Sequence, residues 1–98
     1  MAWTYTNYRW ERSNVRKGDR YYYKRDAVAS WGRTDEQVIA TVSYDDKPTS
    51  MFWGKWHVAF GADIPGLNEL RQAAYDRPKF STKKDAMAWA TAMVRLET

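Results

Sequence analysis

The stretch QVIATVSY, residues 37–44, is the clearest strand in the sequence, and the fold class follows from it. Val38, Ala40, Val42 and Tyr44 alternate with Ile39, Thr41 and Ser43, so the pattern predicts that the two sets face opposite sides of a sheet. β-branched and aromatic residues of this kind suit a pleated, half-buried surface. The chain is therefore expected to contain a sheet with at least one face on a core.

Further strands are indicated on both sides of this stretch. In WTYTNYRW, residues 3–10, the aromatic residues alternate but change phase at Thr6–Asn7, which predicts either a bulged strand or two short strands. RYYYKRDAVASW, residues 20–31, opens with strong strand formers, and GRTDE, residues 32–36, is expected to be a turn. MFWGKWHVAF, residues 51–60, places Trp56, Val58 and Phe60 on one face.

The last third of the chain changes to a helical period. GLNELRQAAYDR, residues 66–77, predicts a short helix that Pro78 limits on its C-terminal side. A longer helix is predicted within FSTKKDAMAWATAMVRLE, residues 80–97, with Ser81 or Thr82 as its cap and Asp85 in its first turn. Its apolar stripe packs on a sheet and contains Ala86, Trp89, Ala90, Met93 and either Val94 or Leu96.

Strands followed by helices define an α+β fold. We expect one small domain over residues 1–98, strand-rich over 1–62 and helical over 66–97. Its antiparallel sheet of about four strands is packed by one main C-terminal helix and a short preceding helix. The chain has 44% hydrophobic and 16% aromatic residues, which is too apolar for a disordered segment.

Catalytic and metal chemistry find little support in the sequence. Without cysteine the chain can form no disulfide, thiolate metal site or cysteine nucleophile, and with His57 as its one histidine it can form no two-histidine metal site. The acidic pair Asp45–Asp46 stands before a proline two residues on and is typical of a turn. We expect a non-enzymatic protein without metal or cofactor. Since no leader or membrane span is indicated, the expected location is the cytoplasm.

The basic segment RWERSNVRKGDRYYYKR, residues 9–25, carries the strongest functional signal. It holds seven of the sixteen basic residues and has a net charge of +5, while the rest of the chain sums to −1. Cations neutralise phosphates and planar side chains stack on bases, so the segment predicts a nucleic-acid site on an aromatic hairpin. The expected contacts are Arg9, Arg12, Arg16, Lys17, Arg20, Tyr22, Lys24 and Arg25.

Protein recognition is the alternative prediction. Six tryptophans are many for one small core, and exposed Trp, Tyr and Arg are enriched at binding hot spots. In this hypothesis the basic hairpin docks on an acidic protein surface, with Trp53 or Trp56 as the anchor. Small size and lack of cysteine also suit accessory proteins of phages or mobile elements, including inhibitors of host defence complexes.

The C-terminal half also resembles a known family. GKWHVAF followed by KFSTKKDAMAWATAMVR is similar to the AP2-like, integrase-type DNA-binding domains, through Trp56, Val58, Phe80, Thr82 and Ala86. The resemblance covers about the last forty-five residues and implies DNA recognition by a small sheet. The chain departs from the family in GADIPGLNELRQAAYDRP, residues 61–78, where the family has a short connection, and in its N-terminal aromatic hairpin.

Overall fold

The fold is a four-stranded antiparallel sheet with two helices, as predicted. The computed structural model describes residues 3–13, 20–45, 49, 54–61, 64–76 and 79–97, and of residues 96 and 97 only the backbone. The strands lie in the order β1-β2-β3-β4. The elements are β1 (Trp3–Arg12), β2 (Arg20–Ala29), β3 (Thr34–Tyr44), β4 (Trp56–Phe60), α1 (Leu67–Asp76) and α2 (Lys83–Glu97). The α+β fold class and the longer C-terminal helix are confirmed.

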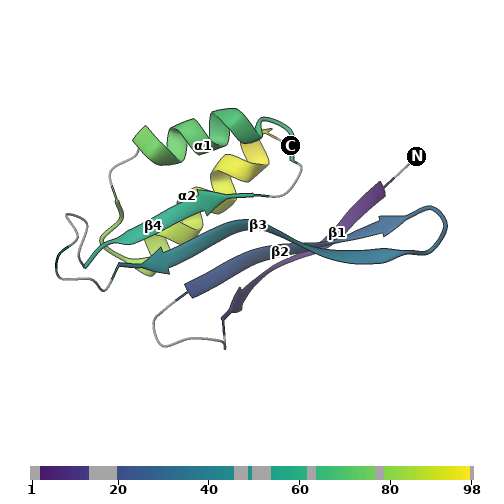
Figure 1. Cartoon of the computed structure of the whole chain (residues 1–98), viewed down its shortest axis with the longest axis horizontal. Helices are drawn as coiled ribbons and strands as arrows, with labels where there is room; N and C mark the ends of the chain where they lie inside the picture. The colour runs from purple at the N-terminus through teal and green to yellow at the C-terminus, as the bar shows by residue number, and fades with distance from the viewer. Residues whose placement is uncertain are drawn as a thin grey trace.

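The two helices cover only part of the sheet. Helix α2 crosses one face of β3 and β4, and α1 lies alongside β4, so the opposite face of the sheet carries no helix (Figure 1). The hairpin between β2 and β3 extends beyond both helices and gives the molecule its length of 49 Å, against 29 and 19 Å in the other directions (Figure 1). Neither described helix combines the length and the apolar character needed to cross a membrane.

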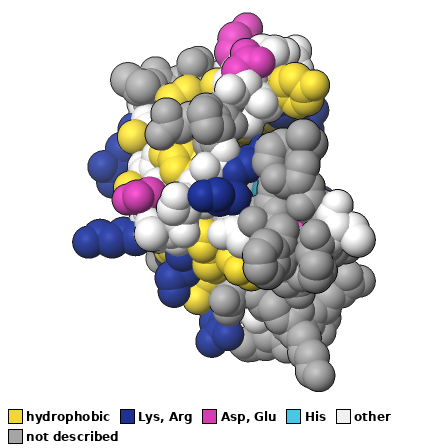
Figure 2. Space-filling model, turned by 90° about the vertical axis from the view of Figure 1, so that its left-hand side faces the viewer, with side chains coloured by type: hydrophobic (Ala, Val, Ile, Leu, Met, Phe, Trp, Pro, Cys, Tyr) yellow, Lys and Arg dark blue, Asp and Glu magenta, His cyan; other side chains and the backbone are white. Residues whose placement is uncertain are grey.

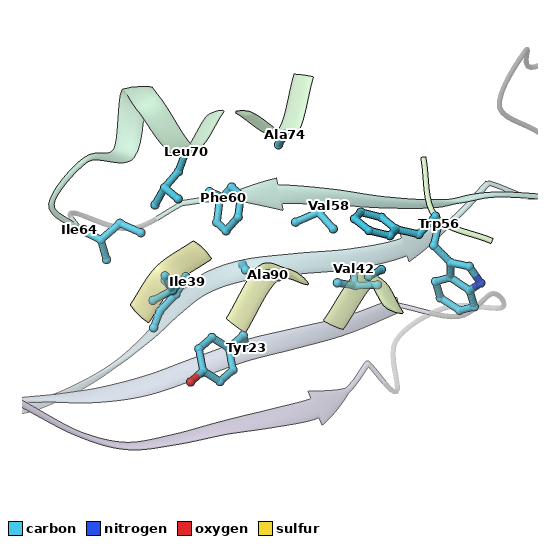
Figure 3. Packing of buried hydrophobic residues seen from close by; sticks show 14 residues of the cluster. Tyr23, Ile39, Val42, Trp56, Val58, Phe60, Ile64, Leu70, Ala74 and Ala90 are labelled. Carbon is cyan, nitrogen blue, oxygen red and sulfur yellow. The ribbon is translucent and has the colours of Figure 1, made fainter. Parts of the chain in front are cut away.

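The hydrophobic core lies between the helices and the nearer half of the sheet. Leu70 and Ala74 of α1 point toward Phe60 and Val58 of β4, as Figure 3 shows. From α2, the predicted stripe supplies Ala86, Ala90 and Val94, which are buried, with Trp89 and Met93 packed against the cluster. Small residues in this stripe let the helix approach the sheet closely, and the Trp10 indole donates to the Thr91 hydroxyl at 3.2 Å to tie β1 to α2.

A bulge in β3 changes which side of QVIATVSY is buried. Tyr23 pairs with Ala40 but Lys24 pairs with Val38, so Ile39 is the extra residue. Ile39 and Ala40 are both buried, whereas Val38 is 39% exposed. The predicted alternation, with Val38 and Ala40 on one face, is therefore wrong at this point, because the bulge shifts the phase of the strand by one residue.

The second bulge explains the aromatic spacing of β1. The register with β2 shifts between Thr6 and Arg9, and Asn7 has a φ of 57°, a left-handed conformation that asparagine tolerates better than most residues. The predicted bulge is confirmed. It brings the aromatic rings on both sides of it to the helix side of the sheet, where Trp3 meets Trp31 and both Tyr8 and Trp10 meet Tyr23.

The turn between β2 and β3 is shorter than predicted. The Ala29 amide donates to the Arg33 carbonyl at 2.8 Å, and β3 already begins at Thr34, so the segment GRTDE is turn only in its first half. Gly32 makes the reversal possible with a φ of 95°, a conformation that other residues adopt at a cost. The tight reversal lengthens the hairpin and brings Glu36 opposite Asp26.

The bulge predicts that substitutions at two neighbouring residues change the free energy of unfolding by very different amounts. Replacing Ile39, which is fully covered, with alanine is expected to lower the free energy of unfolding by about 2–5 kcal/mol. The matched change Val38→Ala, on the exposed side, is expected to change it by about 0.5 kcal/mol or less. Urea unfolding followed by tryptophan fluorescence measures both values. Equal losses in the two variants would contradict the register described here.

Candidate nucleic-acid interface

Five exposed cations from four segments meet at the end of the sheet opposite the β2–β3 turn. We call this surface the basic end, and it consists of Arg12, Arg20, Lys55, Lys83 and Lys84. Pairing of β1 with β2 and of β2 with β3 brings the first two cations to this end. Figure 2 looks onto it and shows Lys and Arg side chains gathered around hydrophobic ones.

The isolated bridge between Trp56 and Phe80 joins the start of α2 to the sheet. The Trp56 amide donates to the Phe80 carbonyl at 2.8 Å, and the Phe80 amide donates to the Trp56 carbonyl at 3.1 Å. Next to this bridge the Lys55 ammonium lies 3.5 Å from the Ser81 hydroxyl. Two hydrogen bonds thus place the first turn of α2, with its two lysines, beside β4.

Aromatic rings form the floor of the basic end. Trp56 lies between Tyr21 and Tyr44, with ring centroids 6.3 and 5.2 Å away. The Lys83 ammonium stands 4.6 Å from the centre of the Tyr21 ring and donates to its hydroxyl at 3.0 Å. Tyr44 is 37% exposed, whereas Trp56 is 8% exposed. The arrangement offers cations for phosphate groups and one accessible ring for a base.

The N-terminus of α2 adds partial positive charge at the same place. Thr82 caps the helix, because its hydroxyl accepts from the Asp85 amide at 3.2 Å and its carbonyl accepts from the Ala86 amide at 3.2 Å. The first amides of a helix carry the positive end of its macrodipole, which attracts anions. Asp85 partly offsets this charge, yet two lysines, an unusual choice for a first turn, keep the local balance positive.

Tyr22 lies at the margin of the basic end. Its side chain is half-buried. A hydrogen bond with Arg20, and to a smaller extent one with Ser13, lower the pKa of its hydroxyl below the usual value of 10.0. The Lys24 ammonium is 5.8 Å from the centre of its ring. The predicted stacking residue is thus held by neighbouring polar groups on the helix-free side of the sheet.

Two of the predicted contact residues take part in an ion network on that helix-free side. Arg9 meets Glu11 at 2.8 Å, Asp26 at 3.2 Å and Glu36 at 2.6 Å. Lys24 meets Glu36 at 2.9 Å and Glu11 at 3.5 Å. Three carboxylates against two cations give this group a net negative charge, so Arg9 and Lys24 are not a phosphate-binding surface in this arrangement.

Arg25 is buried, which corrects the expectation that it flanks an exposed tyrosine. The residue is 2% exposed, and its guanidinium carbon lies 3.7 Å from the centre of the Tyr5 ring. Its Nε donates to the Gln37 side-chain oxygen at 2.8 Å, while its buried Nη2 makes no hydrogen bond with the part of the chain that the structure describes. Stacking and a side-chain amide hold Arg25 inside the hairpin, so a phosphate group has no access to it.

The remaining predicted contacts divide between described and undescribed positions. Arg12 and Arg20 belong to the basic end, whereas Arg16, Lys17 and Trp53 lie outside the described residues. Trp56 is buried, so the expectation that it anchors a partner at the surface is wrong; it packs under Tyr21 and Tyr44 instead.

The sequence prediction missed the lysines of α2. Lys83 and Lys84 lie in the first turn of a helix, where acidic residues are usually favoured. Two lysines at such a position are unfavourable for the helix, and this pattern in the sequence could have indicated a functional role. Their proximity to Tyr21, however, depends on a contact across 62 residues of chain, which no local pattern contains.

His57 lies beside an acidic side chain. Its Nε2 lies 3.3 Å from a carboxylate oxygen of Asp45, and the two side chains form a local pair on the helix-free side. Among residues 3–13, 20–45, 49, 54–61, 64–76 and 79–97 there is no cluster of three or more histidine and carboxylate side chains placed to hold a metal ion.

Comparison with protein-family models, with curated proteins and with solved structures found no match for this chain. The resemblance to AP2-like domains therefore stays a prediction, and the functional argument rests on the geometry of the basic end.

The ion network predicts a loss of stability in acid. The hydrogen bond from Arg9 lowers the pKa of Glu11 below 4.5, and hydrogen bonds from Asn7 and Arg9, with the charge of Arg9, lower the pKa of Asp26 below 3.8. Groups with a depressed folded-state pKa stabilise the protein above their unfolded pKa, and this stabilisation is lost as the pH falls through the folded values. The urea midpoint is therefore expected to drop from about pH 5 downward.

Arg9→Met tests the cause of this drop. Without the guanidinium, the pKa values of both carboxylates return toward normal, so the midpoint is expected to fall less between pH 6 and pH 3 than in the wild type. Arg33→Met at the distant hairpin turn is the control, because Arg33 pairs only with Asp35 among the ion pairs described. An acid-induced drop of the wild-type size in Arg9→Met would show that the network is not its source.

Proposed function

We propose that the protein binds nucleic acid through the basic end, without sequence-specific base contacts as its main source of affinity. One observation carries the proposal, namely that five exposed cations from four segments lie at one end of the sheet, where the aromatic rings of Tyr21, Trp56 and Tyr44 also lie. Phosphate contacts by lysine and arginine supply most of the affinity in such sites. The ring of Tyr44 is exposed enough to stack on an unpaired base.

The position of the site differs from the one expected from charge counting. Arg12 and Arg20 are kept from the predicted set, and Lys55, Lys83 and Lys84 join them, while Arg9, Lys24 and Arg25 serve the fold. Five cations in contact with phosphates give a steep dependence of affinity on salt, because each contact releases a condensed counterion.

Protein recognition is the second candidate, and the exposed aromatic residues of β1 and of the β2–β3 turn favour it. Trp31 is 56% exposed, Tyr8 43% and Tyr5 41%, and residues of this type dominate binding hot spots. The predicted anchor is therefore replaced by a different set of rings, on β1 and in the β2–β3 turn.

A double charge reversal tests the nucleic-acid proposal. Lys83→Glu with Lys84→Glu removes two cations, and glutamate in the first turn suits the helix dipole, so the helix itself is retained. Fluorescence anisotropy with labelled single- and double-stranded DNA and RNA, at about 50 and 200 mM salt, is expected to show weaker binding and a salt slope reduced by about two.

Arg33→Glu with Arg71→Glu is the matched control, since it changes the net charge equally at exposed positions outside the basic end. The control is expected to bind nearly as the wild type does. Equal losses in both double variants would assign the binding to net charge alone. No binding of the wild type to any of the four nucleic acids at low salt would overturn the proposal and favour protein recognition.

A further inference from the structure

The outer edge of β4 carries backbone groups that the sheet leaves unpaired. In an antiparallel pair, hydrogen-bonded residue pairs alternate with non-bonded ones. The Asp45 amide donates to the Lys55 carbonyl at 2.9 Å, so this pair is bonded, and Trp56, Val58 and Phe60 turn their amides and carbonyls away from β3. The Trp56 groups bond to the chain at residue 80, whereas no described residue bonds to the amide or the carbonyl of Val58.

This edge opens into a groove between β4 and α1. The groove has a volume of about 290 Å³, and Val58, Ala59 and Phe60 line one side. Arg71, Ala74 and Tyr75 of α1, together with Lys79, line the rest. Figure 3 shows that Ala74 points from α1 toward this strand. The volume is near the lower limit of ligand pockets, so the groove suits a short segment of about two or three residues and not a folded domain.

The positive charge of the groove determines which kind of extended segment it favours. Arg71 and Lys79 are the two charged side chains among the residues that line it, and both are cationic. The Arg71 Nε reaches the Phe60 carbonyl at 3.5 Å, which places the guanidinium at one end of the open edge. Tyr75 is 83% exposed beside them and adds an aromatic surface. An occupant with carboxylates is complementary to this lining.

We propose that the groove binds an extended, acidic peptide segment as an additional strand on β4. The edge offers a hydrogen-bond donor and an acceptor at Val58, so it matches a peptide backbone, which carries both groups. A simple anion is a poorer match, because it can accept from the amide but cannot donate to the carbonyl oxygen. The chain itself already uses this edge once, because Phe80 pairs there with Trp56 through two hydrogen bonds.

The test uses the full chain and a defined probe, the fluorescein-labelled peptide acetyl-Glu-Val-Glu-Val-Glu-amide. Alternating glutamate and valine favours an extended strand and places carboxylates on one side. Binding is followed by anisotropy at about 50 mM salt and by the amide shifts of ¹⁵N-labelled protein. We expect saturable binding that shifts the Val58 and Phe60 amides and slows hydrogen exchange at Val58.

Two comparisons separate strand addition from attraction of charge. The same peptide with its interior amides N-methylated keeps the carboxylates but loses the donors, and it is expected not to bind. Arg71→Glu is expected to weaken the unmodified peptide about tenfold, which equals roughly 1.4 kcal/mol, whereas the control Arg33→Glu changes binding less than twofold. The melting temperature of each variant confirms that it is folded.

Three results would overturn the proposal. The first is no saturable binding of the unmodified peptide, the second is equal binding of the N-methylated peptide, and the third is shifts confined to residues away from β4. The unmodified and the N-methylated peptides are both compared on the wild-type protein. The test of strand addition is therefore valid even if Arg71→Glu fails to fold.

Discussion

The structure depends on two bulges that lie opposite neighbouring residues of β2. Opposite Lys24–Asp26, β1 carries an extra residue between Thr6 and Arg9, and opposite Tyr23–Lys24, β3 carries the extra residue Ile39. Side chains in a strand alternate between the two faces of the sheet. Each bulge therefore determines which residues of β1 or β3 lie on the same face as a given residue of β2. As a result Lys24 lies with Arg9 and Glu36 on the helix-free side, while Arg25 lies under Tyr5 on the other side.

This arrangement divides the basic segment into cations with different roles. Arg9 and Lys24 bridge three strands through carboxylates, and Arg25 fills the base of the hairpin that extends past the helices. Solvent-exposed ion pairs contribute little each, but a shared network fixes register, since a slip of one residue would place these charges on the apolar face. Arg12 and Arg20 occupy the last residue of β1 and the first of β2, so both are exposed at the end of the sheet.

The sequence was sufficient for the elements because their periods are strong. Alternation in 56–60 and the three-to-four spacing from Ala86 onward are each visible within one window, and both agree with the burial observed. The bulge at Ile39 had no such signal, because Val38, Ile39 and Ala40 are all apolar and either phase buries a hydrophobic residue. The bulge at Asn7 was visible because aromatic residues on each side of it made the phase change explicit.

The candidate site was harder to predict for a different reason. Counting charges in a segment treats every cation as available, yet Arg9 meets Glu36 across 27 residues of chain and Lys83 meets Tyr21 across 62. The net charge of +4 is the same whether a cation is paired or exposed. Only the pairing of strands shows that exposed cations gather at the start of α2 and at the adjoining ends of β1 and β2, and not along the face of β2.

The basic end and the β4 groove are connected by residues 79–82 and by β4 itself. Lys79 lines the groove, Phe80 pairs with Trp56, and Thr82 caps the helix that carries Lys83. Coupling between two binding surfaces requires an element that both ligands bias toward the same state. The bridge at Phe80 is such an element: in the two proposals above, a peptide would bind to β4 close to it, and an anion would bind at the helix that begins three residues later. The pairing of Phe80 with Trp56, whose ring also forms the floor of the basic end, is therefore one contact through which the two surfaces are connected.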